Sequence, residues 1–190
     1  MSLPKDTLGR PLRDLRISVI DRCNLRCGYC MPAKIFGPDY PFLPASDLLD
    51  FDEIARLSRL FAQCGVKKIR LTGGEPLLRP GLPDLVRSLA AIEGVEDLAL
   101  TTNGLMLSDL AIPLREAGLR RITVSLDAIS RDIALRVNGR ADSADRTMEG
   151  IVAAQNAGLG VKVNSVVQRG LNEQDVLPLA RRFRGTGVTL

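Results

Sequence analysis

The chain of 190 residues has 26 basic and 22 acidic side chains, and its formal net charge is a modest +4. An apolar fraction of 45% and a charged fraction of 25% are typical of a globular protein, and we expect a single domain over residues 1–190. The sequence contains no apolar run of the roughly 18 residues that cross a membrane and no signal-peptide core at its start, which predicts a cytoplasmic protein without a membrane partner. The charge does not indicate nucleic acid and suits a negatively charged small ligand equally well. The sequence lacks histidine, which excludes mechanisms that need an imidazole base or ligand.

Short β-rich runs alternate with amphipathic helical patterns along the chain. The predicted strands cover residues 16–20, 68–73, 98–103, 121–127, 161–167 and 187–190. The clearest helix begins at Asp50, which forms a capping signal with Glu53, and its apolar stripe runs from Ile54 to Cys64. Alternation of strands and helices predicts an α/β fold with a parallel sheet.

Alternate residues of these strands form an apolar set and a polar set, and the apolar set is expected to lie under the helices. The polar set is Arg16, Ser18, Arg70, Thr72, Thr101, Asn103, Thr123, Ser125, Asp127, Lys162 and Asn164. A flat parallel sheet covered on both sides would be apolar on both faces. A sheet curled into a barrel with a wet lumen explains the polar face better, and the alternative is a sheet with one solvent-exposed face. Arg16, Arg70 and Lys162 would converge in such a lumen as a seat for phosphates.

The stretch DRCNLRCGYC places three cysteines, Cys23, Cys27 and Cys30, directly after the first predicted strand. In a parallel barrel the functional loops follow the carboxyl ends of the strands. Cys64 is expected at the opposite rim, buried as a small hydrophobic residue, and therefore too far away to be a fourth ligand. Three thiolates would hold three irons of a cubane and leave the fourth iron open. The alternatives are a structural zinc, which would need a fourth ligand nearby, and chance clustering.

The C-x-x-x-C-x-x-C spacing, with Tyr29 before its last cysteine, resembles the signature of radical S-adenosylmethionine enzymes. The resemblance implies a [4Fe–4S] cluster on the three cysteines, whose open iron is chelated by S-adenosylmethionine. Reductive cleavage of this cosubstrate would give a 5′-deoxyadenosyl radical that abstracts hydrogen from the substrate. LTGGEP, TTNG and SLD resemble further elements of that family. The residues that the resemblance assigns to S-adenosylmethionine are Tyr29, Gly73, Gly74, Glu75, Thr102, Asn103 and Ser125.

Three stretches, SVIDRCNLRCGYCMP, KKIRLTGGEPLLR and ITVSLDAI, together resemble the molybdenum cofactor biosynthesis protein A family, the GTP 3′,8-cyclases. The resemblance implies conversion of GTP to 3′,8-cyclo-7,8-dihydro-GTP with an electron donor protein, and it allows a homodimer. It assigns GTP contacts to Arg16, Arg70, Thr101 and Lys162. Members of that family continue into a C-terminal region with a second cluster on three more cysteines. We therefore expect the amino-terminal two-thirds of such a protein, a partial (β/α)6 TIM-like barrel truncated at or just after its sixth strand, and incomplete cyclisation by this chain alone.

Two other functions stay open at this point. Another radical S-adenosylmethionine enzyme would act on a peptide or a tetrapyrrole, although the cations of the predicted lumen argue against it. A non-catalytic iron–sulfur electron carrier or a structural zinc module belongs to a different class. The open iron disfavours an electron carrier, because the cluster of a carrier is normally fully ligated.

Overall fold

The computed structural model of the chain describes residues 4–190. Its described part contains one parallel sheet in the order β1-β2-β3-β4-β5. The strands are β1 (Asp14–Ser18), β2 (Lys68–Thr72), β3 (Asp97–Thr102), β4 (Arg121–Ser125) and β5 (Gly160–Asn164). Because neighbours in the sheet are consecutive in the chain and all parallel, each connection is a crossover on the helical face. The structure therefore confirms the predicted α/β fold as a partial barrel.

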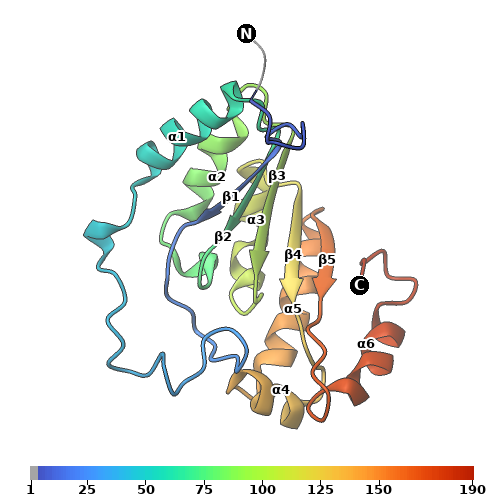
Figure 1. Cartoon of the computed structure of the whole chain (residues 1–190). Coiled ribbons are helices and arrows are strands. Elements are labelled where there is room, and N and C mark those ends of the chain that lie inside the picture. Colours follow the sequence, from blue (N-terminus) through green and yellow to red (C-terminus); the bar gives the residue numbers. More distant parts are fainter. Residues whose placement is uncertain (1–3) are drawn as a thin grey trace.

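The crossovers contain helices that lie along one face of the curved sheet (Figure 1). The helices are α1 (Phe51–Gln63), α2 (Leu82–Ala90), α3 (Leu107–Glu116), α4 (Arg131–Asn138), α5 (Ser143–Asn156) and α6 (Val176–Phe183). Three short 3-10 turns cover Ala45–Asp47, Pro76–Leu78 and Glu173–Asp175. The arrowheads of the strands point to the edge of the sheet at which the blue segment after β1 lies, and this edge is called the rim below (Figure 1). This rim gathers the loops that carry the predicted motifs.

The period-two alternation of the strands predicts the two faces of the sheet correctly. Ile69 and Leu71 of β2 are fully buried under the helices, as are the corresponding apolar residues of β3, β4 and β5. On the opposite face Arg16 and Lys162 are exposed and Arg70 is half-buried. The core thus lies between the sheet and its helices, and the polar face is open to ligands.

The predicted sixth strand, residues 187–190, is reduced to one parallel bridge between Thr189 and Lys162 of β5. The Val163 amide donates to the Thr189 carbonyl at 2.7 Å, and the Thr189 amide donates to the Val161 carbonyl at 3.2 Å. Gly187 has a φ of 78°, so the chain turns just before it reaches β5. The prediction was therefore wrong in the extent of this strand, although its neighbour and direction are as expected.

Helix α1 begins at the predicted capping signal. Asp50 Oδ1 accepts from the Glu53 amide at 2.7 Å, and Glu53 Oε2 accepts from the Asp50 amide at 2.9 Å. These two bonds satisfy amide donors that the first turn of a helix otherwise leaves unpaired. The sequence signal alone thus fixes the start of this helix.

The end of α1 differs from the prediction. Helical geometry stops at Gln63, and Cys64 is an exposed C-cap rather than a buried member of the apolar stripe. Phe61, one turn earlier, is 38% exposed. Gly65 follows with a φ of 105°, which ends the helix and turns Cys64 away from the core. The prediction of a buried Cys64 was therefore wrong.

Candidate functional site

The loop after β2 packs backbone to backbone against the cysteine loop after β1. The Gly74 amide donates to the Ile20 carbonyl at 2.6 Å, and the Glu75 amide donates to the Arg22 carbonyl at 2.8 Å. A Cβ atom on Gly74 would collide with the Arg22 carbonyl, and one on Gly73 with the Ile20 carbonyl. Both glycines are thus needed for the contact between these two loops, and the predicted approach to a ligand stays a prediction.

Glu75 ties the β2 loop to the β3 loop. Its side chain is 1% exposed, and its carboxylate accepts from Thr102 Oγ1 at 2.5 Å, from the Asn103 amide at 2.7 Å and from the Leu77 amide at 3.0 Å. Burial raises the pKa of Glu75, and these three donors oppose the shift. Three donors of the protein itself thus occupy most of the acceptor sites of this carboxyl group.

Asn103 extends these contacts to the cysteine loop. Its side-chain amide donates to Asn24 Oδ1 at 2.7 Å and to Cys23 Sγ at 3.8 Å, while its Oδ1 accepts from the Leu105 amide at 3.0 Å. Its backbone carbonyl accepts from Thr147 Oγ1 of α5 at 2.8 Å. The loops after β1, β2 and β3 are therefore fixed relative to one another.

The cysteine loop itself presents three free thiols that differ in exposure. Cys23 and Cys27 are half-buried and Cys30 is exposed. Burial, followed by the negative charges of Asp127 and the other two cysteines, raises the pKa of Cys27 to about 12. Burial likewise raises the pKa of Cys23. These shifts keep the thiols protonated in the absence of a cation, so a metal centre held by this loop would have to displace their protons.

The donor set fits an iron–sulfur cubane better than a single metal ion. Within residues 4–190, no three thiol and carboxylate side chains converge closely enough to hold one ion, which disfavours the zinc alternative. Thiolates that each bind a different iron do not need to converge on one point. A Cβ atom on Gly28 would meet nothing within 4 Å, so the middle of the loop borders open space. The three cysteines therefore fit a cluster that lies in the open space beside this loop.

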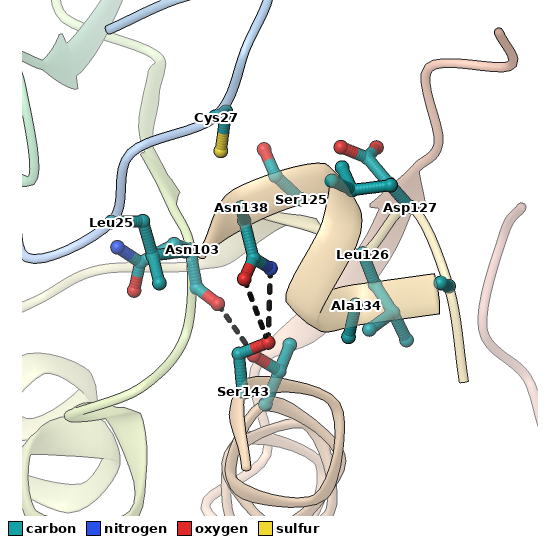
Figure 2. Close-up of a pocket in the computed structure, with 12 residues that line it drawn as sticks. Leu25, Cys27, Asn103, Ser125, Leu126, Asp127, Ala134, Asn138 and Ser143 are labelled. Atoms are coloured by element: carbon teal, nitrogen blue, oxygen red, sulfur yellow. Dashed lines mark hydrogen bonds between the residues drawn. The ribbon is translucent and has the colours of Figure 1, made fainter. Parts of the chain in front are cut away.

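A pocket opens beside this loop at the carboxyl end of β4 (Figure 2). It is lined by Leu25, Cys27, Asn103, Ser125, Leu126, Asp127, Ala128, Ala134, Val137, Asn138, Ser143 and Thr147. In Figure 2 the Cys27 sulfur points into it, and the hydrogen bonds of Asn138 with Ser143 close its floor. The structure thus brings together three predicted site residues, Cys27, Asn103 and Ser125.

Tyr29 links the cysteine loop to the loops after β4 and β5. Its hydroxyl donates to Asp127 Oδ2 at 2.7 Å, and Asp127 Oδ1 accepts from the Val166 amide at 2.8 Å. Burial and the bond to Asp127 raise the pKa of Tyr29. Asp127 is absent from the predicted site residues, although its place in the SLD stretch on the polar face could have identified it.

Arg26 is a second residue that the sequence reasoning missed. Its guanidinium donates to the carbonyls of Cys23 at 2.7 Å, Leu25 at 2.9 Å and Phe36 at 2.7 Å. It thereby fastens the cysteine loop to the aromatic segment that follows it. Its spacing carries no signal, because these acceptors are backbone groups.

The strand register places the predicted nucleotide contacts in two rows on the open face. Arg16 lies opposite Arg70, and both share a row with Ala99 of β3. Thr101 shares the next row with Lys162, through β4 between them. The second row is two residues, or about 7 Å, nearer the cysteine rim. All four residues predicted to contact GTP therefore lie in two adjacent rows of one face.

Ion pairing separates the cations of this face into two groups. Arg121 pairs with Asp97, and Lys68 pairs with Asp14 at 2.7 Å. On this face, the cations that make no ion pair or side-chain hydrogen bond with residues 4–190 are Arg16, Arg70 and Lys162. Thr101 Oγ1 is also buried with no partner in the same range. Within residues 4–190, the side chains of the predicted phosphate contacts therefore have no ion-pair or hydrogen-bond partner.

Comparison with known proteins defines the class of this protein. The chain matches the sequence model of the radical SAM superfamily over residues 17–183. The chain belongs to this superfamily, and its cofactors are accordingly a [4Fe–4S] cluster and S-adenosylmethionine. Among solved structures, SuiB of Streptococcus suis bound to S-adenosylmethionine is similar, with a TM-score of 0.76 at 18% identity over 94% of this chain and 39% of that one. Methylornithine synthase has a TM-score of 0.67 at 18% identity over 93% of this chain and 51% of that one, and both likenesses show the fold alone.

The relatives that share more than half of its residues carry one specific name within this superfamily. The chain is 53% identical to the GTP 3′,8-cyclase of Staphylococcus epidermidis over 97% of its own length and 54% of that protein. It is 56% identical to the GTP 3′,8-cyclase of Xanthomonas campestris pv. campestris, over 98% of its length and 55% of that protein. The chain thus spans about half the length of the curated relatives it matches, rather than the two-thirds predicted. Within residues 4–190, no helix is long and apolar enough to cross a membrane.

Proposed function

We propose that the chain is the radical S-adenosylmethionine core of a cytoplasmic GTP 3′,8-cyclase, which converts GTP to 3′,8-cyclo-7,8-dihydro-GTP. The observation that carries the proposal is that Arg16, Arg70, Lys162 and Thr101 share the open face and have no side-chain partner within residues 4–190. The relatives of the chain are named GTP 3′,8-cyclase. The chain spans about half the length of those relatives. In this proposal the chain binds the cluster, the cosubstrate and the phosphates of GTP. Complete cyclisation is assigned to a protein of the full length of those relatives.

The phosphates of GTP would bind across the two rows of the open face. Arg16 and Arg70 offer planar guanidinium forks that donate two parallel hydrogen bonds to a phosphate, and Lys162 adds a point charge one row nearer the rim. The Thr101 hydroxyl, which is buried and has no partner among residues 4–190, supplies a further donor. The cations come from β1, β2 and β5 and from two rows about 7 Å apart along the strands, and separated cations suit an extended polyphosphate better than a single phosphate. The nucleoside would then point toward the cysteine rim.

The residues at the rim would hold the cluster and the cosubstrate. Cys23, Cys27 and Cys30 would each bind one iron, and Ser125 in the adjoining pocket would contact S-adenosylmethionine. When bound, these cofactors supply the radical that takes hydrogen from the substrate, with an electron from a donor protein. Tyr29 and the backbone of Gly73 and Gly74 would complete the cosubstrate site.

The remaining predicted contacts of S-adenosylmethionine are buried, unlike Tyr29. They are Glu75, Thr102 and Asn103. Their side chains are buried and bonded to one another or to the cysteine loop. We assign them to the support of the cosubstrate site, since few of their polar atoms are left for a ligand. The loops they hold in register carry the residues that touch the cofactors.

Anaerobic binding and isotope transfer test this proposal. Reconstituted protein should be stabilised against heat by GTP and by inorganic triphosphate, because both present the polyphosphate. The variant Arg16→Ala should lose most of this stabilisation, and the exposed Arg56→Ala control should keep it. Deuterium from GTP labelled at ribose C3′ should appear in 5′-deoxyadenosine. Absence of both stabilisation and isotope transfer would favour a peptide or tetrapyrrole substrate instead.

A further inference from the structure

The three cysteines differ in the hydrogen bonds that reach their sulfur atoms. Cys23 Sγ accepts from the Leu25 amide at 3.4 Å and from the side-chain amide of Asn103 at 3.8 Å. Within residues 4–190, the sulfurs of Cys27 and Cys30 accept no hydrogen bond from another residue. The sulfur of Cys23 is therefore distinguished from the other two cysteine sulfurs by N–H donors of the protein.

The orientation of the Asn103 side chain is fixed by its other contacts. Oδ1 accepts from the Leu105 amide at 3.0 Å, and one amide hydrogen is directed to Asn24 Oδ1 at 2.7 Å. A flipped amide would set oxygen against Asn24 Oδ1 and Cys23 Sγ, and would leave the Leu105 amide facing a donor. The second amide hydrogen is thus committed to the cysteine sulfur.

The backbone of Asn103 is held just as firmly. Its amide donates to Glu75 Oε2 at 2.7 Å, and its carbonyl accepts from Thr147 Oγ1 at 2.8 Å. The residue is only 9% exposed, so water competes little for the amide hydrogen that faces the thiolate. The donor is therefore preorganised by α5 and by the β2 loop.

We propose that Asn103 is a positioning residue that holds Cys23 for the cluster and, through its N–H···S hydrogen bond, raises the reduction potential of that cluster. Reduction adds negative charge to the irons and their thiolates, and an N–H donor stabilises the more negative state more strongly. The proposal concerns the cluster that every member of this superfamily carries, so it stands or falls independently of GTP as the substrate.

A redox titration of the anaerobically reconstituted protein, followed by electron paramagnetic resonance, tests the proposal. Asn103→Leu removes the donor and keeps the branching of the side chain at Cγ. Asn138→Leu is the matched control, because Asn138 lines the same pocket and its side chain bonds Ser143 (Figure 2). Its only other side-chain bond within residues 4–190 is from the Arg140 amide. At a fixed potential the ratio of reduced to oxidised cluster should fall about three- to tenfold in Asn103→Leu, tenfold being about 59 mV for one electron. Equal potentials in the two leucine variants would overturn the proposal.

A second pair of variants keeps the test decisive if Asn103→Leu does not fold. Asn103→Asp retains the acceptor for the Leu105 amide and replaces the N–H donor by a carboxylate oxygen, while Asn138→Asp adds the same charge to the same pocket. The potential or the iron content should be lower in Asn103→Asp than in its control. If potential and iron content are the same in both, Asn103 neither positions Cys23 nor tunes the cluster.

If neither Asn103 variant folds, the wild-type protein provides the measurement. Pulsed electron paramagnetic resonance of the reduced cluster, with ¹⁵N in the asparagine side chains, should show a weakly coupled amide nitrogen. A spectrum without this coupling would contradict the hydrogen bond to Cys23.

Discussion

Replacing Glu75 by glutamine tests whether this carboxylate is a structural tie between loops. The group is 1% exposed and accepts three hydrogen bonds, from Thr102, Asn103 and Leu77, at 2.5, 2.7 and 3.0 Å. Glutamine is nearly the same size, but its NH2 must face at least one of those donors and leave it buried and unsatisfied. An unsatisfied buried donor costs about 1–3 kcal/mol. Glu75→Ala, which leaves all three donors unsatisfied, should cost about 3 kcal/mol or more.

The free energy of unfolding of the apoprotein, measured by urea titration under reducing conditions, is the assay. Glu93→Gln is the control, because Glu93 is exposed and a surface change of this kind stays within about 0.5 kcal/mol of wild type. Were Glu75 a contact of S-adenosylmethionine alone, its replacement would weaken cosubstrate binding and leave the unfolding of the apoprotein unaltered. An unfolding free energy for Glu75→Gln within about 0.5 kcal/mol of wild type would refute the structural role.

Three further predictions concern the thiols, the open face and an ion pair. Cys27→Ala should abolish the cluster and cosubstrate cleavage, whereas Cys64→Ala should keep both and change the unfolding free energy by less than about 0.5 kcal/mol, since Cys64 is exposed. Iron analysis and urea unfolding check these outcomes. A cluster in Cys27→Ala would contradict the ligand assignment. Lys162→Ala should weaken GTP and inorganic triphosphate binding by about tenfold in calorimetry, and unchanged affinity would remove Lys162 from the phosphate site. The hydrogen bond from Arg121 lowers the pKa of Asp97 below its usual 3.8, so the stability that this pair contributes is full above that pH and is lost as the pH falls through the lower folded pKa. Asp97→Asn should therefore destabilise the protein at pH 7 and do so less at pH 3. An equal loss of unfolding free energy at the two pH values, measured in urea, would contradict this prediction.

The strands and their two faces could be predicted because they depend on a local pattern. A period of two in a strand fixes which side chains share a face, so the set of Arg16, Arg70 and Lys162 emerged without any knowledge of neighbours. The ends of elements were less accessible. Cys64 continues the apolar stripe in sequence, but Gly65 ends the helix before that position can be buried.

The residues of the candidate site were found by motif, but their individual roles depend on contacts across the chain. Glu75 and Asn103 are 28 residues apart, and only the fold shows that the carboxylate of one holds the amide of the other. Arg121 lies in the same row of the sheet as Arg70, and its neutralisation depends on Asp97 in the neighbouring strand. Pairing of this kind leaves no local signature, so the sequence could propose the site and not its supporting hydrogen bonds.

The central claim is that three cysteines hold three irons of a cubane and leave the fourth iron for S-adenosylmethionine. Mössbauer spectra of the ⁵⁷Fe-reconstituted protein, recorded with and without the cosubstrate, test it most directly. We expect about four irons per chain, of which a single site changes its parameters when S-adenosylmethionine is added. Four iron sites that all keep their parameters, or a protein that takes up zinc in place of iron, would contradict the claim.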